Sequence, residues 1–126
     1  MGMPLAVDGC TLEISSGGSG PAPTVVNTPS DSIDVSGKGV FFKEIKFSVM
    51  GVTAGDITNA DGRGEGTISG TGENIDENGD YAVLEGDESE EITVEGTKSS
   101  PSGPVHASGK IKVKVKSAGQ TDVIAL

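Results

Sequence analysis

The sequence predicts an all-β protein, and three observations lead to that prediction. Val, Ile and Thr recur in short alternating runs, and clusters of Gly, Asn, Asp, Pro and Ser separate these runs. No run has the 3.6-residue spacing of an amphipathic helix. Since 126 residues fit one compact domain, we expect a single all-β domain over residues 1–126.

Composition excludes several classes of function. Apolar residues make up 33% of the chain, which excludes a large dry core. Aromatic residues make up 3%, too few for a stacking surface for single-stranded nucleic acid, and a net charge of −10 repels phosphate backbones and anionic lipid. No run approaches the roughly 20 apolar residues of a spanning helix. We expect neither nucleic-acid binding nor stable membrane insertion.

The first element is a loop. Residues 15–31 are rich in Gly, Ser and Pro, as flexible linkers are, but they lie between two segments of strand-like content. We therefore expect a long flexible loop within the domain rather than a domain boundary. The N-terminal residues 1–7 are too short and too uncharged for a Sec-type signal.

Residues 41–49 form the clearest strand, because apolar and polar side chains alternate with period 2. One face carries Phe41, Lys43, Ile45, Phe47 and Val49, in which Lys43 is the single misfit. The other face carries Phe42, Glu44, Lys46 and Ser48. The following run 61–66 contains alternate glycines but precedes no helix, so we expect a loop without a phosphate-binding role.

Two further strands have one charged face. Residues 91–95 alternate Glu and Thr with Ile and Val, and residues 110–116 alternate four Lys with Ile111, Val113 and Val115. The cationic strand should border solvent or an acidic neighbour. Residues 51–100 carry a net charge of −11 and residues 101–126 carry +3, so these regions should attract each other. Lysines on exposed strands commonly block edge-to-edge aggregation, and a charged docking surface is the alternative.

Three segments share a turn followed by a strand. They are residues 33–38, 75–80 and 105–110, and each holds Ser-Gly or Asn-Gly, the dipeptides that tight hairpin turns favour. If the repeat is structural, it predicts three similar hairpins around one axis.

A resemblance to a known family supports that prediction. Residues 66–87 resemble the PAAR unit, in which Gly, an apolar residue and a Gly/Ser pair precede an extended segment, Asn-Gly, small apolar residues and Gly-Asp. Residues 3–10 resemble the start of PAAR-like tip proteins, and residues 30–49 are similar to a looser copy of the unit without the closing Gly-Asp.

The resemblance implies a small all-β cone with pseudo-threefold symmetry that docks on the blunt end of a trimeric β-helical spike, VgrG-like or of a phage tail. Such proteins sharpen the spike of contractile injection systems for membrane piercing, in type VI secretion and phage baseplates among others, and carry effectors in some cases. The chain would then be cytoplasmic before assembly and ejected afterwards. The expected docking residues are Ile33, Val35, Val40, Phe42, Ile75, Tyr81, Val83, Val105, Ile111 and Val113.

The metal site of the family is not expected here. Family members commonly bind zinc through three His and one Cys, whereas this chain offers only Cys10 and His106. A structural zinc site needs four ligands. A single cysteine also excludes an intrachain disulfide. We therefore expect no cofactor.

No catalytic set can be assembled from the sequence. Nucleophilic hydrolysis needs a Ser or Cys beside a base, and His106, the only histidine, reads as a polar turn residue. Residues 76–80 offer oxygen ligands at alternate positions, but Tyr81 stands where a calcium loop needs Gly, so a tight turn is the better interpretation.

The leading hypothesis is therefore a non-enzymatic spike tip. The alternative is a small acidic β-sandwich adhesin or carbohydrate-binding module that uses Tyr81, and a hydrolytic effector comes third.

Overall fold

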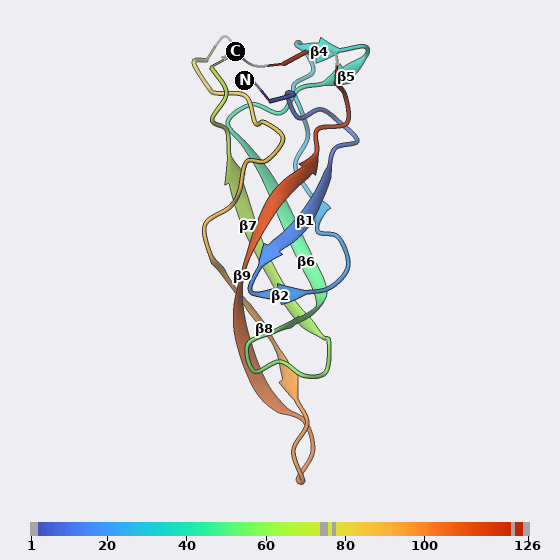
Figure 1. Cartoon of the computed structure of the whole chain (residues 1–126), viewed down its shortest axis with the longest axis vertical. Coiled ribbons are helices and arrows are strands. Elements are labelled where there is room, and N and C mark those ends of the chain that lie inside the picture. Colours follow the sequence, from blue (N-terminus) through green and yellow to red (C-terminus); the bar gives the residue numbers. More distant parts are fainter. Residues whose placement is uncertain (1–2, 74–75, 77, 122, 125–126) are drawn as a thin grey trace.

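The computed structural model describes residues 3–73, 76, 78–121 and 123–124, and the described residues contain strands and turns but no helix (Figure 1). The predicted all-β class is confirmed. The strands are β1 (Thr11–Ser16), β2 (Gly18–Ser19), β3 (Thr24–Val25), β4 (Asp34–Val35), β5 (Lys38–Gly39), β6 (Glu44–Ala54), β7 (Gly62–Ser69), β8 (Ile92–Lys98) and β9 (Val105–Ser117).

The main sheet is a nearly closed barrel. Its strand order is β1-β9-β8-β7-β6-β2, and every named pair in it is antiparallel. The first and last strands of this order are consecutive in the chain and are separated only by Gly17. β1 pairs with β9, and β2, which follows directly in the chain, pairs with β6. The two edges of the sheet are thereby brought together. The sheet is one curled layer, not the two stacked layers of a β-sandwich.

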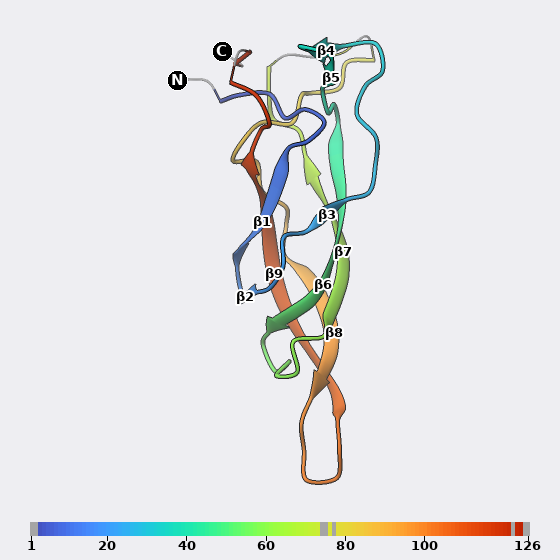
Figure 2. The ribbon, with the colours of Figure 1, turned by 90° about the vertical axis from the view of Figure 1, so that its right-hand side faces the viewer.

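The molecule is long and tapered, in agreement with the expected small cone (Figures 1 and 2). Its broad end holds the β4–β5 hairpin and the two ends of the chain. Its narrow end is the β8–β9 hairpin, which projects beyond the other strands.

The barrel interior is narrow and is filled mainly by aliphatic side chains, with the rings of Phe41 and Phe47. The core includes Phe47, Ile45, Ile68, Ile111 and Val113, all buried. The barrel is narrow because the glycines on the inner face of β7 let side chains of neighbouring strands approach its backbone closely. A Cβ on Gly66 would lie 2.6 Å from the ring of Phe47, and one on Gly64 would lie 2.9 Å from Val94.

The alternate glycines of 61–66 therefore belong to a strand, and the predicted loop is wrong. Gly62 to Ser69 form β7. The glycines are spaced by two because they occupy the inner face, where partner side chains leave no room for a Cβ.

The predicted strand at 41–49 begins later and runs further than expected. Ile45, Phe47 and Val49 are buried as predicted, but β6 starts at Glu44 and continues to Ala54. Lys43 has a φ of 71° and is exposed, so the backbone turns there and the misfitting lysine leaves the inner face.

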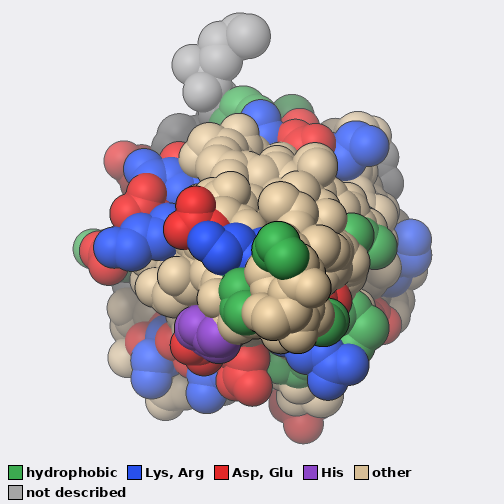
Figure 3. Space-filling model, turned by 90° about the horizontal axis from the view of Figure 1, so that it is seen from below, with side chains coloured by type: hydrophobic (Ala, Val, Ile, Leu, Met, Phe, Trp, Pro, Cys, Tyr) green, Lys and Arg blue, Asp and Glu red, His purple; other side chains and the backbone are tan. Residues whose placement is uncertain are grey.

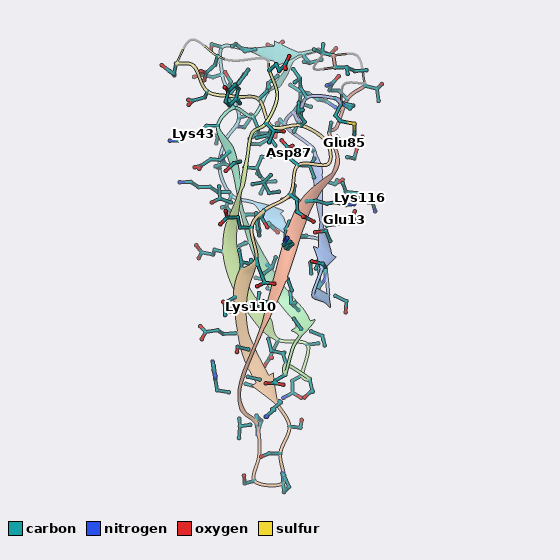
Figure 4. All side chains as sticks on the ribbon, turned by 60° about the vertical axis from the view of Figure 1, so that its left-hand side comes forward. Glu13, Lys43, Glu85, Asp87, Lys110 and Lys116 are labelled. Atoms are coloured by element: carbon teal, nitrogen blue, oxygen red, sulfur yellow. The ribbon has the colours of Figure 1, made fainter. Side chains whose placement is uncertain are left out.

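The strands with charged faces are confirmed. Ile111, Val113 and Val115 of β9 are buried, and Val94 of β8 is buried while its neighbours in the chain are exposed. The lysines of β9 do border acidic neighbours, because Lys114 Nζ lies 3.4 Å from Glu13 and Lys112 Nζ lies 4.0 Å from Glu88. Figure 4 shows these lysines spread along β9, from Lys116 near the broad end to Lys110 toward the narrow end.

Residues 15–31 lie along the barrel and pair with it. Gly18 and Ser19 pair with Ala54 and Thr53, and β3 pairs with Ser48 and Phe47 of β6. The Gly/Ser/Pro-rich segment therefore does more than connect two strands, because its residues 18–19 and 24–25 pair with β6.

Two of the three expected turns are present. Ser36 and Gly37 have φ of 54° and 84° and connect β4 to β5, and Gly79 has φ of 84°. The third expected turn, at Ser108–Gly109, lies inside β9, which is a correction. Gly109 is needed there because a Cβ would lie 2.5 Å from the backbone of Ala54, where β6 crosses β9.

The turn that connects β8 to β9 lies further toward the narrow end. Ser100 and Gly103 exchange backbone hydrogen bonds of 3.2 and 3.0 Å, and Gly103 has φ of 112°.

Candidate docking surface

The broad end of the molecule exposes large apolar side chains, which we call the broad-end patch. Its members and their exposed fractions are Met3 41%, Tyr81 56%, Val123 37% and Ile124 46%. Exposed apolar groups gathered at one end of a soluble domain are typical of contact surfaces.

Hydrogen bonds join the two chain ends beneath this patch. Pro4 and Ile124 form an antiparallel bridge, and the amide of Leu5 donates to the carbonyl of Val123 at 3.2 Å. The side chain of Gln120 donates to the carbonyls of Leu5 and Val123 at 2.9 and 2.8 Å. Its carbonyl oxygen accepts from the Val123 amide at 2.8 Å. One amide side chain thus fixes both segments that carry the patch.

A second apolar cluster lies under the broad end, separate from the barrel core. Its buried members are Leu5, Val7, Val35, Val40 and Ala82. The half-buried side chains of Ile33, Phe42 and Leu84 pack against it. Because this cluster joins the N-terminal segment to the β4–β5 hairpin, the broad end has an internal support of its own.

The structure divides the expected docking residues into three groups. Val35, Val40, Val83, Ile111 and Val113 are buried, so their side chains offer no contact surface in this structure. Tyr81 and Val105 are exposed, and Ile33 and Phe42 are half-buried. Ile75 lies outside the described residues.

Val105 also stands apart from the rest. It pairs with Lys98 at the base of the narrow hairpin, whereas Tyr81, Ile33 and Phe42 lie at the broad end. No one surface therefore unites the predicted residues. A docking role at the broad end stays a prediction for Tyr81, Ile33 and Phe42.

The narrow end has a different chemistry. Viewed from below, the protruding tip shows mostly uncharged, tan surface with a few apolar side chains in green (Figure 3). The connecting residues are Ser99, Ser100, Pro101, Ser102, Gly103 and Pro104, none of which is charged.

The base of the narrow hairpin is braced by the loop between β6 and β7. Asp61 accepts hydrogen bonds from the amide of Thr97 at 2.8 Å and from its hydroxyl at 2.5 Å. These bonds lower the pKa of Asp61, with the hydroxyl bond as the largest cause. The Asn59 side chain donates to the Thr97 hydroxyl at 2.9 Å and accepts from the Ser99 hydroxyl at 2.8 Å.

The two weak metal candidates lie far apart along β9. Cys10 lies beside Gly119, just beyond the end of β9, and His106 is near its beginning. His106 lies 3.3 Å from Glu95 on the neighbouring strand. Burial, with the charge of Asp8 as a second cause, raises the pKa of Cys10 to about 11, which leaves the thiol protonated and a poor ligand. The described residues contain no group of three or more His, Cys, Asp or Glu arranged to hold a metal.

The sequence predicts a tight turn rather than a calcium loop at residues 76–80, and the described residues 76 and 78–80 form a turn in which the Asp76 side chain accepts backbone hydrogen bonds. Asp76 Oδ1 accepts hydrogen bonds from the amides of Asn78 and Asp80 at 2.9 and 3.0 Å, and the Asp76 carbonyl accepts from Gly79 at 3.1 Å. This carboxylate is engaged by its own backbone, as in an Asx turn.

Comparisons with known proteins identify no relative: no family model, no curated protein and no solved structure matches this chain. Within the described residues, no helix is long and apolar enough to cross a membrane.

Sequence reasoning missed the residues that define the broad end. Met3, Val123 and Ile124 belong to short apolar stretches near the two ends of the chain, where no periodic pattern marks them. Gln120 and Asp61 are single polar residues in loops, and only the fold shows that each holds two distant segments together. The sole available signal was that apolar residues stand at both ends of a chain otherwise poor in them.

Proposed function

We propose that this chain is a non-enzymatic tip protein that docks by its broad end on a trimeric β-helical spike and presents the β8–β9 hairpin as its point. The observation that carries the proposal is the taper, with exposed apolar side chains at the broad end and an uncharged turn at the narrow end.

The broad end supports docking by burial of apolar surface. Met3, Tyr81, Val123 and Ile124 each leave more than a third of their surface exposed. Burying such side chains contributes roughly 25 cal/mol per Å² of apolar area, and association of the folded state raises its stability. Because only 33% of the residues are apolar, burial at the docking surface should supply a large share of the stability of the folded state.

The narrow end supports a mechanical role. The two strands stay paired from Ile92–Ile111 in the barrel to Lys98–Val105 beside the turn, and Asp61 and Asn59 hold the end of β8 to the β6–β7 loop. Pro101 and Pro104 restrict the backbone conformation beside the turn. Residues 99–104 carry no charge, so their entry into the apolar interior of a membrane would desolvate no charged group.

The identity of the partner comes from the resemblance of residues 66–87 to the PAAR unit. Within the fold, this segment begins on β7 and returns to the broad end, where Ala82 and Val83 enter the two apolar clusters. The segment that carries the resemblance is therefore part of the proposed base.

Light scattering of this protein mixed with its cognate trimeric spike tests the proposal. We expect a complex of one copy per trimer. The double variant Met3→Ser, Ile124→Ser should weaken the complex at least about tenfold, because it removes apolar contact area from the base. Absence of any complex with the unaltered protein would contradict the proposed function.

A matched control locates the docking end. Met50 on β6 and Val105 on β9 are also exposed apolar side chains, but they lie away from the broad end. The variant Met50→Ser, Val105→Ser should bind the spike as the unaltered protein does. Equal weakening by both double variants would show that docking does not use the broad end.

A further inference from the structure

Near the broad end, β7 has an edge that pairs with no strand among the described residues. β7 pairs with β6 from Glu44–Ser69 to Val49–Gly64, but it pairs with β8 only at Arg63–Glu95. β8 begins at Ile92, and the preceding residues 87–89 bond β9 instead. The part of β7 nearer the broad end is therefore paired on one side.

The hydrogen bonds of β6 show which backbone groups of β7 are free. The carbonyls of Lys46 and Glu44 accept from Val26 and from the Asn27 side chain, so both residues direct their backbone groups away from β7. Their cross-strand partners are Thr67 and Ser69. In an antiparallel ladder such non-bonded partners both point outward, so Thr67 and Ser69 direct their N–H and C=O groups toward the free edge.

A groove lies along this edge. Its volume is about 580 Å³, and it is lined by Thr67, Ser69, Thr71, Glu88, Glu90, Glu91 and Ile92. We call it the β7 groove. Its floor is closed where Ile92 packs over Gly66, since a Cβ on Gly66 would lie 2.8 Å from Ile92.

The far wall of the groove is fixed to β9. Ser89 donates its amide to the Val113 carbonyl at 2.7 Å, and its hydroxyl accepts from the Val113 amide at 3.0 Å. Asp87, labelled in Figure 4, receives the Thr71 hydroxyl at 2.5 Å and the Leu84 amide at 2.8 Å. The Ser89 bonds hold this part of the wall against β9, and the Thr71–Asp87 bond joins the wall to the segment after β7.

The charge of the groove selects its occupant. Glu88, Glu90 and Glu91 are exposed along the wall. Glu88 lies near Lys112 and accepts from the Ser15 hydroxyl, whereas Glu90 and Glu91 form no ion pair with any described residue. The lysine strand of a second copy does not fit, because residues 112–115 of β9 already pair with β1 on one edge and with residues 87–89 on the other.

We propose that the β7 groove binds an extended, lysine- or arginine-bearing segment of a partner protein, which adds to the free edge of β7 as a strand. Backbone hydrogen bonds to Thr67 and Ser69 give this mode its affinity, and Glu90 and Glu91 select basic side chains. The inference goes beyond the proposed function and does not depend on docking to a spike.

NMR titration with a short synthetic peptide of alternating Lys and Thr tests this inference. We expect the amide signals of Thr67 and Ser69 to shift and their hydrogen exchange to slow. An otherwise identical peptide of alternating Glu and Thr should leave both signals unchanged. No shift of these amides at up to about 1 mM basic peptide would overturn the inference.

Two controls separate strand addition from simple charge attraction. The basic peptide with N-methyl groups at alternate residues keeps its charge but loses one edge of hydrogen-bond donors, so it should bind at least about tenfold more weakly. The variant Glu90→Gln, Glu91→Gln should lose affinity similarly. The matched variant Asp31→Asn, Asp56→Asn changes the net charge equally and should bind normally. Equal binding of the methylated peptide would overturn strand addition.

Discussion

At the residue scale, this fold depends on a few polar side chains that each hold two segments together. Gln120 joins the N-terminal segment to the last described residues, and Asp61 joins the β6–β7 loop to β8. Ser89 is the single buried polar side chain among the described residues, and it is bonded to both Glu90 and Val113. In a chain with little apolar material, these contacts fix positions that packing alone leaves open.

Asp61 gives the first prediction, a pH dependence of stability. Its pKa is lowered in the folded protein, so its contribution is complete above the ordinary pKa of an aspartate and is lost as pH falls through the lowered folded value. We expect Asp61→Ala to be less stable than the unaltered protein at pH 7, and the difference to shrink in acid. Urea unfolding at several pH values measures it.

Asp56 supplies the control for that prediction. It lies in the same loop and is exposed, and only its backbone amide is hydrogen-bonded, to Ser108 at 3.1 Å. Asp56→Ala should therefore leave stability and its pH dependence nearly unchanged. A constant difference between Asp61→Ala and the unaltered protein down to strongly acid pH would contradict the assignment of the lowered pKa.

At the element scale, glycines decide where strands can cross and where the sheet can close. The glycines of β7 make room for Phe47 and Val94, and Gly109 of β9 lets the end of β6 approach. Gly17 connects β1, which pairs with β9, to β2, which pairs with β6. A Cβ on Gly17 would lie 2.1 Å from the Lys110 carbonyl oxygen, and its φ is +87°. Closure of the barrel thus depends on a residue without a side chain.

The second prediction compares two glycines of like backbone conformation. Gly37 also has a positive φ, +84°, but a Cβ there would meet nothing within 4 Å. We expect Gly37→Ala to cost about 1–2 kcal/mol for the left-handed backbone alone. Gly17→Ala should lower the unfolding free energy by about 1–3 kcal/mol more than Gly37→Ala does, because the Lys110 carbonyl must move. Urea unfolding of both variants measures the difference.

Equal losses for the two variants would contradict a closure point at Gly17. The comparison needs no reference to function, because both substitutions remove the same conformational freedom and differ only in what surrounds the new methyl group.

At the scale of the whole molecule, the taper separates a supported base from a projecting hairpin. The buried clusters extend from the broad end to the barrel, and none of the residues 99–104 belongs to them. The projection should therefore contribute little to folding, which leaves its composition free to serve a contact made by the narrow end.

The third prediction tests this separation. Replacing residues 99–104 by Asn-Gly joins Lys98 to Val105, which already face each other as a cross-strand pair. We expect the unfolding free energy to change by no more than about 1 kcal/mol, because the substitution shortens an exposed loop. Ile111→Ala, in the barrel core, should instead cost about 2–5 kcal/mol. A loss of similar size from the shortened loop would show that the tip is part of the folding core.

Period-2 alternation determined the all-β class and the buried faces of β6 and β9, because alternation is a local property of extended chain. For the lysine strand the sequence left solvent or an acidic neighbour open, and the structure shows acidic neighbours. Ser36–Gly37 was likewise predicted as a turn from its dipeptide. Only the tertiary structure decided that Ser108–Gly109 is strand, that the glycines of 61–66 face inward, and that residues 18–25 close the barrel. In each case glycine is required by a neighbour distant in sequence, and no local pattern carries that contact.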